Sequence, residues 1–144
     1  MKTFTVDASV AIKWVIEEEG TQAALALRHR PLAAPDLLIA ECANILWKKV
    51  RKGELSEEEA AFAARLLARA DVDLMPMRPY LEAATRIAVS LDHPAYDCVY
   101  LAMAEAEKSV FVTADQRFLR KVRQAASGRF SSCIMDLADV MASH

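Results

Sequence analysis

The sequence predicts a single α/β domain in which a short parallel sheet is covered by helices on both faces. Short runs of β-forming residues alternate with longer helical patterns along the chain. A length of 144 residues suits one domain, and no linker, repeat or composition shift divides residues 1–144. With 54% hydrophobic and 26% charged residues, the composition is that of a globular chain and excludes a disordered one.

The first part of the chain predicts two strands and two helices. Thr3–Val6 is rich in β-forming residues, and Ala8–Val15 places its apolar residues on one side of a helix. Gly20 ends that segment, after which Thr21–His29 predicts another helix. Leu32–Ala34 lies between two prolines and predicts a short strand.

Capping residues define the next two helices. Asp36 is a favourable N-cap for a helix over Leu37–Lys52. Ser56 and Glu59 have the spacing of a capping box, which opens a helix over Glu57–Ala70. These signals predict where both helices begin.

The remaining elements continue the alternation. An alternating apolar pattern predicts a strand over Asp71–Met77, a proline starts a helix over Pro79–Leu91, and Val110–Thr113 is a compact apolar strand. The helix expected over Ala95–Glu107 must be largely buried, because its first ten residues carry one charge. The last three expected elements are the helix Asp115–Ala126, the strand Cys133–Met135 and the helix Leu137–Ala142.

The composition excludes several classes of protein. The three glycines form no GxGxxG loop, Walker A loop or GxSxG elbow. Three cysteines without a CxxC pair indicate neither a disulfide framework nor a zinc site, and they favour a reducing, cytoplasmic location. The longest charge-free run, Gly20–Leu27, has eight residues, whereas a membrane-spanning helix needs about 20. We therefore expect no membrane partner.

Four acidic residues stand out from the pattern. Asp7 and Asp115 each follow a predicted strand directly, at the edge of a parallel sheet where ligands bind. Glu41 lies beside an apolar helical stripe, and Asp97 is the one charge in the apolar half of its helix. Each acid alone has an ordinary explanation: a helix N-cap, a surface position or a favourable charge near a helix N-terminus.

As a set, the four acids predict a cation site. If their carboxylates converge, they cannot all stay ionised without a cation. Carboxylates with retained waters suit Mg²⁺ or Mn²⁺. Zinc is disfavoured because the chain has only three histidines.

A basic segment follows Asp115. The net charge of −2 gives no reason to expect nucleic acid, but residues 116–130 contain five basic residues and no acid. Arg117, Arg120 and Lys121 share a helical side and are expected to bind RNA phosphates. The alternative is a solvated helix face.

Four segments carry a resemblance to a known family. They read DASVAIKW, PDLLIAECANILWK, LDHPAYDCVYLAMAE and VTADQRFL, in that order. In these segments the chain resembles PIN-domain proteins, and among them the VapC-type toxins of type II toxin–antitoxin pairs. The family's catalytic, metal-binding acids match Asp7, Glu41, Asp97 and Asp115, and the hydroxyls that accompany them match Ser9 and Thr113.

The resemblance implies a three-layer α/β/α sandwich with a short parallel sheet, forming a single PIN domain. It also implies a Mg²⁺-dependent endoribonuclease that cleaves RNA phosphodiester bonds with a metal-activated water. The implied partners are RNA, a cognate antitoxin protein and a second copy of the chain.

Two other classes of function stay open. A metal-dependent DNA nuclease or a phosphatase would use the same acidic cluster. A non-catalytic protein-interaction domain would instead pair its acids with its own basic clusters.

Several further side chains have two interpretations. Tyr96 and Tyr100 are candidates for stacking on unpaired bases, although core or interface positions are commoner for aromatic residues. His93 precedes a proline and is interpreted as a turn residue. An exposed apolar stripe that would form a homodimer interface is expected from Leu46, Trp47, Phe62, Leu66 and Leu67.

Overall fold

The structure is a computed structural model that describes residues 2–125 and 128–141. Within these ranges, five strands form one parallel sheet in the order β3-β2-β1-β4-β5. The strands are β1 (Phe4–Val6), β2 (Leu32–Pro35), β3 (Asp73–Met75), β4 (Val110–Thr113) and β5 (Ile134–Asp136). The predicted alternation of strands and helices is confirmed.

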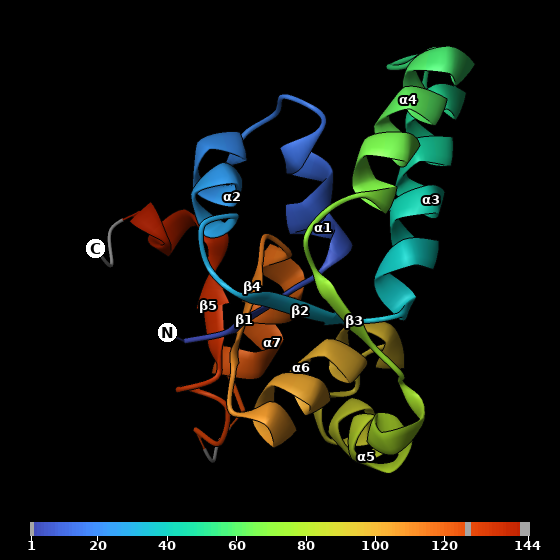
Figure 1. Ribbon diagram of the computed structural model, residues 1–144. Coiled ribbons are helices and arrows are strands. Elements are labelled where there is room, and N and C mark those ends of the chain that lie inside the picture. Colours follow the sequence, from blue (N-terminus) through green and yellow to red (C-terminus); the bar gives the residue numbers. More distant parts are fainter. Residues whose placement is uncertain (1, 126–127, 142–144) are drawn as a thin grey trace.

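Helices cover both faces of this sheet. α1 (Ala8–Ala11) and α2 (Thr21–Leu27) lie on one face, and α5 (Leu81–Leu91) and α6 (Ala95–Glu107) lie on the other (Figure 1). α7 (Gln116–Arg123) follows β4 and packs against β5. The architecture is therefore the predicted three-layer α/β/α sandwich.

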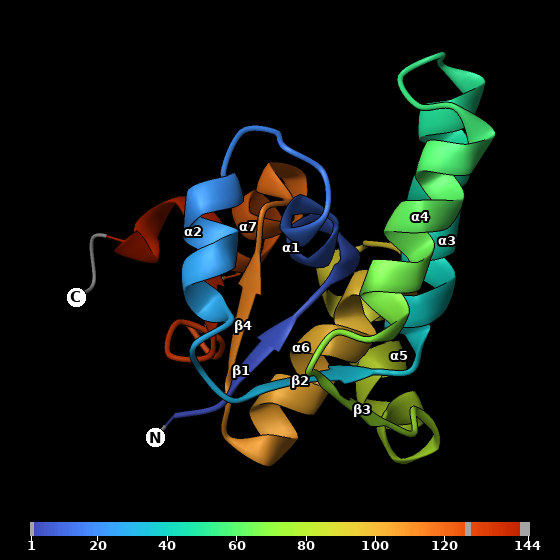
Figure 2. The same ribbon diagram turned by 45° about the horizontal axis from the view of Figure 1, so that its top comes forward.

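Two long helices extend beyond one edge of the sheet. α3 (Leu37–Arg51) and α4 (Glu57–Ala68) pack side by side and stand clear of the other layers in both views (Figures 1 and 2). The predicted capping box is present, since Ser56 and Glu59 exchange side-chain to backbone hydrogen bonds. We call this helix pair the α3–α4 arm.

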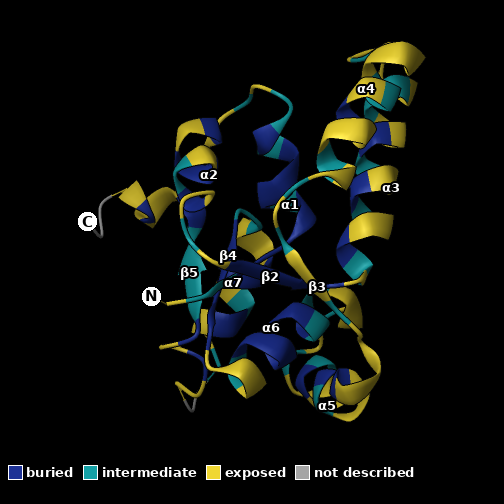
Figure 3. Cartoon of the chain, in the orientation of Figure 1, coloured by how far each residue is buried: buried dark blue, intermediate teal, exposed yellow. Residues whose placement is uncertain are grey.

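The core lies on both faces of the sheet, under α1 and α2 on one side and under α6 on the other. Every residue of β2 and β4 is buried, as the dark ribbon at the centre of Figure 3 shows. Six of the thirteen residues of α6 are buried, which confirms the inference from its lack of charge. This burial fixes α6 against β1, β2 and β4.

Several element boundaries differ from the predictions. The segment expected as the helix Ala8–Val15 is α1 followed by a 3₁₀ turn over Ile12–Trp14. The helix expected from Pro79 begins with a 3₁₀ turn over Arg78–Tyr80. Asp36 already has helical φ and ψ, so its side chain does not accept a capping hydrogen bond.

The end of the chain also differs from the prediction. The last predicted helix is a 3₁₀ turn over Leu137–Asp139, and its expected end at Ala142 lies outside the described residues. The helix predicted over Asp115–Ala126 is shorter than expected, because α7 ends at Arg123; Ala126 itself lies outside the described residues. Among the described residues, no helix combines the length and apolar character needed to cross a bilayer.

Candidate functional site: an acidic crevice

An open crevice of about 480 Å³ is lined by all four predicted acids. It lies at the carboxyl ends of β1 and β4, which are neighbours in the sheet although far apart in the chain. The strand order reverses direction here, because the chain runs from β1 outward through β2 and β3 and then returns to β4. Such switch points form crevices in parallel sheets. Four separate parts of the chain contribute the acids, which are Asp7, Glu41, Asp97 and Asp115.

Asp7 is the most enclosed of these acids. Its residue is 4% exposed, and it directly follows β1. Ser9 Oγ donates a hydrogen bond of 2.5 Å to Asp7 Oδ1, and Thr113 Oγ1 donates one of 2.5 Å to Oδ2. The Val10 backbone N–H also donates to Oδ1, which makes Asp7 the N-cap of α1. Both carboxylate oxygens are therefore held by the protein.

Burial is the main cause that raises the pKa of Asp7, from its ordinary 3.8 to about 7. The hydrogen bonds from Ser9 and Thr113 lower this pKa, because they stabilise the carboxylate. The negative charges of Asp97 and Glu41 raise it. The crevice thus favours the neutral form of Asp7 unless a cation compensates its charge.

Ser9 and Thr113 act as a linked pair around Asp7. Ser9 Oγ accepts a hydrogen bond from the Ala114 N–H, and Thr113 Oγ1 accepts one from the Asp115 N–H, each of 3.1 Å. The bond between Ala114 and Ser9 ties the segment after β4 to the segment after β1, whereas the bond between Asp115 and Thr113 is local. The predicted role of the two hydroxyls beside the acids agrees with these contacts.

Glu41 reaches the crevice from α3. Its Oε1 accepts a hydrogen bond of 2.6 Å from the hydroxyl of Tyr100, a fully buried residue of α6. Partial burial raises the pKa of Glu41, the Tyr100 hydrogen bond lowers it, and the charge of Asp97 raises it. The bond leaves Oε2 of Glu41 without a protein partner among the described residues.

Asp97 lies in the first turn of α6, as expected for a charge that suits a helix N-terminus. Its Oδ2 is 2.7 Å from His93 Nε2. Burial raises the pKa of Asp97, the His93 hydrogen bond lowers it, and the Asp115 charge raises it. Two of the acids that line the crevice therefore repel each other across it.

Asp115 is the N-cap of α7. Its Oδ1 accepts a hydrogen bond of 3.1 Å from the Phe118 N–H. The capping explanation considered for Asp7 and Asp115 is therefore correct for both, and both also line the crevice. Capping and lining are compatible because a carboxylate has two oxygens with several lone pairs.

The donor set fits a hard divalent cation held partly through water. Within residues 2–125 and 128–141, no group of three or more acidic, histidine or cysteine side chains is already arranged to hold an ion. Mg²⁺ is usually bound through one or two carboxylates and keeps several waters, so it needs no preformed cage. Burial first, and neighbouring carboxylates second, raise the pKa values of Asp7, Glu41 and Asp97, and a bound cation would offset both effects.

The basic residues expected to bind phosphate lie outside the crevice lining. Arg117 and Arg120 are exposed on α7, two and five residues after Asp115. Lys121 Nζ donates a hydrogen bond to the backbone oxygen of Asp92, so it would have to give up this bond to reach a phosphate. The two arginines are the freer candidates.

An apolar groove of about 730 Å³ adjoins the acidic crevice. Leu37 and Tyr96 line both, and Met77 and Leu81 continue the groove away from the acids. Tyr96 is 65% exposed, whereas Tyr100 is buried and bonded to Glu41, so only Tyr96 has a face open for stacking.

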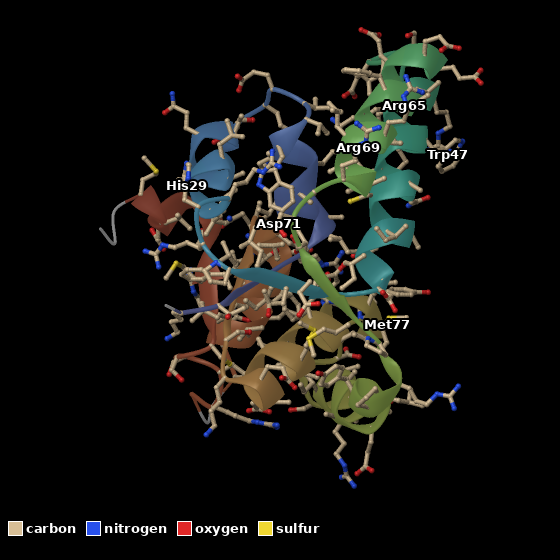
Figure 4. The ribbon with its side chains drawn as sticks, in the orientation of Figure 1. His29, Trp47, Arg65, Arg69, Asp71 and Met77 are labelled. Carbon is tan, nitrogen blue, oxygen red and sulfur yellow. The ribbon has the colours of Figure 1, made fainter. Side chains whose placement is uncertain are left out.

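The apolar stripe expected on the α3–α4 arm is present in part. Trp47, Phe62 and Leu66 are exposed, and Trp47 points outward from α3 in Figure 4. Leu46 is buried instead, because it packs with Ile12 in a small cluster between the arm and the body of the domain. Leu67 is half-buried against the same cluster.

The sequence reasoning named Tyr100 as a stacking candidate and His93 as a turn residue, but it missed the contacts of both side chains with the acids. Tyr100 lies three residues after Asp97 on α6, and His93 lies four residues before it. Helical spacing shows that such residues share a side, but it does not show that a tyrosine on α6 meets a glutamate on α3. His93 does lie in the expected turn, and its side chain also contacts Asp97.

Comparisons with known proteins agree with this geometry. The PIN domain family matches residues 4–124. Ribonuclease VapC3 of Pyrobaculum aerophilum is 34% identical over 121 residues, which cover 81% of this chain and 92% of the relative. Exonuclease VapC9 of the same organism is 34% identical over 101 residues, which cover 69% and 74%.

Solved structures share the fold. The crystal structure of PAE2754 from Pyrobaculum aerophilum superposes with a TM-score of 0.70 at 25% identity, covering 98% of this chain and 96% of that one. Mycobacterium tuberculosis VapC20, described as a sarcin-ricin loop cleaving toxin, superposes with a TM-score of 0.61 at 15% identity, covering 81% and 93%.

We expect the wild-type protein to lose stability between about pH 5 and pH 8 without divalent ions, and Asp7→Asn to reduce that loss by about 1–3 kcal/mol. A raised pKa means that the folded state holds the proton more tightly than the unfolded state. The stabilisation is complete below about pH 4 and is lost as the pH rises through about 7. Urea denaturation in a chelator at both pH values measures the difference.

The control for this prediction is Asp71→Asn, which removes an exposed carboxylate. Asp71 precedes β3 and lies at the opposite end of that strand from Met77, away from the carboxyl ends that form the crevice (Figure 4). An Asp7→Asn protein with the same pH dependence as wild type and Asp71→Asn would contradict the pKa assignment.

Proposed function

The chain belongs to the PIN domain family and is a relative of VapC ribonucleases, and on this premise we propose that it is a Mg²⁺- or Mn²⁺-dependent endoribonuclease. We further propose that it acts in the cytoplasm as the toxin of a toxin–antitoxin pair. The observation that carries the proposal is Asp7, a buried carboxylate that lines one crevice together with three other acids. Burying such a charge costs free energy, so its presence here indicates a functional site.

Asp7, Glu41, Asp97 and Asp115 would hold the divalent ion, directly or through water. When bound, the ion would activate a water for attack on phosphorus and would neutralise charge on the phosphate oxygens. No side-chain nucleophile is needed for this chemistry.

The other residues of the site would position these acids. Ser9 and Thr113 fix both oxygens of Asp7 and keep it from rotating. Tyr100 occupies Oε1 of Glu41, which leaves Oε2 to accept a hydrogen bond or a proton inside the crevice. Preorganised acids of this kind do not have to reorient during the reaction.

RNA is the proposed substrate. Arg117 and Arg120 follow Asp115 on an exposed helix and would bind phosphates beside the crevice, with Lys121 as a further candidate. Tyr96 is exposed at the rim, where its ring could stack on an unpaired base.

Two protein partners are proposed. The exposed apolar residues of the α3–α4 arm, Trp47, Phe62 and Leu66, would form the interface of a two-fold dimer. An antitoxin would lie in the apolar groove that shares Leu37 and Tyr96 with the crevice, and it would place a basic side chain among the acids.

Cleavage of single-stranded RNA should require Mg²⁺ or Mn²⁺ and should stop with a chelator. Asp7→Asn and Asp97→Asn should each reduce the rate by about 100-fold or more, since even residues that only orient metal ligands cost about 10–100-fold. Asp71→Asn should cleave at the wild-type rate. Wild-type activity in Asp97→Asn would show that the site assignment is wrong.

The substrate set for this assay separates the competing functions. A circular single-stranded RNA is cut by an endonuclease and resists an exonuclease, the activity named for one relative. Preferential cleavage of duplex DNA, or of a phosphate monoester, would support the second enzyme class instead. Absence of Mn²⁺ binding in calorimetry would support a non-catalytic interaction domain.

The salt dependence of RNA binding tests the arginines. Each lost phosphate contact should flatten the log–log slope for single-stranded RNA by about 0.7, so Arg117→Ala with Arg120→Ala should flatten it by about 1.4. Fluorescence anisotropy with Asp97→Asn protein avoids cleavage during the measurement. The double variant Arg69→Ala with Arg86→Ala removes two exposed arginines, one directly after α4 and one on α5, and should leave the slope unchanged. If the slope is unchanged in Arg117→Ala with Arg120→Ala, these arginines belong to a solvated helix face and do not bind RNA phosphates.

The oligomeric state tests the α3–α4 arm. Light scattering at micromolar concentration should give a dimer mass for the wild-type protein and a monomer mass for Phe62→Asp, because the charge would be buried in the interface. Val89→Asp changes an exposed residue of α5 and should remain dimeric. A monomeric wild-type protein would remove the dimer proposal without affecting the nuclease proposal.

A further inference from the structure

His93 lies in the turn between α5 and α6, with its side chain against the acidic crevice. Its Nε2 is 2.7 Å from Asp97 Oδ2, and its side chain is 6% exposed. Asp97 has no other hydrogen bond from a side chain among the described residues. The contact is thus the main restraint on where this carboxylate points.

The backbone of His93 is fixed by the way α5 ends. Asp92 has a left-handed φ of 51°, and the His93 N–H donates to the Ala88 oxygen while the Asp92 N–H donates to the Val89 oxygen. This pair of bonds is a Schellman motif, which closes a helix in a defined geometry. Pro94 follows and restricts His93 to extended conformations. The imidazole therefore starts from a rigid Cα.

The imidazole ring is also held from the side of α7. Its centroid is 4.9 Å from that of Phe118, which is fully buried, and Lys121 Nζ donates to the backbone oxygen of the preceding Asp92. Phe118 in turn donates its N–H to Asp115. The imidazole thus contacts both Phe118, whose N–H is bonded to Asp115, and the carboxylate of Asp97.

The second ring nitrogen identifies what the ring does. Among the described residues, Nδ1 of His93 is buried and has no hydrogen-bond partner. A lone pair is less costly to leave unpaired than an N–H, so the favoured neutral tautomer carries its hydrogen on Nε2 and donates it to Asp97. If this position served packing alone, a phenylalanine or leucine would fill the space without burying an unpaired nitrogen.

We propose that His93 is a positioning residue that donates Nε2–H to Asp97 Oδ2 and so directs Oδ1 of Asp97 toward a divalent ion. The inference rests on the proposed function, because it assigns a role in ion binding by Asp97. His93 itself touches neither the ion nor the RNA. Its loss should weaken ion binding and lower kcat, while KM for RNA changes little.

Three substitutions of His93 separate hydrogen bonding from packing. The amide nitrogen of Gln falls close to Nε2, so His93→Gln can still donate to Asp97. The amide of Asn falls close to Nδ1 and is too short to reach Asp97, and His93→Leu fills space without any donor. Calorimetric titration with Mn²⁺ on the purified full chain measures ion binding directly, with Asp97→Asn for comparison.

We expect His93→Asn and His93→Leu to bind Mn²⁺ about 10–100-fold more weakly than wild type, and His93→Gln to stay within about threefold. Thermal unfolding in a chelator, measured on the same proteins, separates loss of the fold from loss of the hydrogen bond. The inference is supported if affinity follows the presence of the donor across the three variants and not their melting temperatures.

Two results would overturn the inference. One is wild-type Mn²⁺ affinity in both His93→Asn and His93→Leu. The other is an equal loss in all three variants, which would mean that the ring shape and not the donor matters. Absence of Mn²⁺ binding by the wild-type protein would overturn both this inference and the proposed function. The two failures are distinguishable, because the variant results bear only on the inference about His93.

Discussion

The burial of one carboxylate, that of Asp7, is the constraint on which the rest of the site depends. A buried charge without partners is strongly unfavourable, so the surrounding chain must supply donors for it. Ser9 supplies one donor from the segment after β1, and Thr113 supplies the other from the last position of β4. These donors meet at Asp7 only if β1 and β4 are neighbours with their carboxyl ends level, and the pairing of Val6 with Val112 sets that register. The pairing of β1 with β4 therefore sets both the order of the sheet and the geometry of the site.

The helices complete what the sheet begins. α6 is held by its buried face against the central strands, and this placement brings Asp97 to the crevice and Tyr100 within hydrogen-bond reach of Glu41. The Tyr100 hydroxyl then reaches across to Glu41 on α3, so the α3–α4 arm is joined to the body of the domain at the site itself. Packing of apolar residues thus determines which acids meet, although none of those residues takes part in the chemistry.

Much of this arrangement could be predicted from the sequence, and the rest could not for physical reasons. Short runs of β-forming and apolar residues located the strands, and the apolar first half of the Ala95–Glu107 helix made Asp97 conspicuous. Asp36 occupies the predicted N-cap position of α3, but its side chain accepts no capping hydrogen bond, because the residue has helical φ and ψ, which its side chain alone does not determine. The contact between Tyr100 and Glu41 depends on how two distant helices pack, which local spacing does not encode.

The crevice stores electrostatic repulsion that the rest of the fold must overcome. Raised pKa values at Asp7, Glu41 and Asp97 mean that each carboxylate is less stable as an anion here than in water. A chain selected only for stability would replace at least one of them with a neutral residue. Keeping all four is consistent with selection for a cationic ligand, whose charge converts the mutual repulsion into attraction. The same crowding would attract any cation that fits, so a basic side chain from a partner protein would compete for the place of a divalent ion.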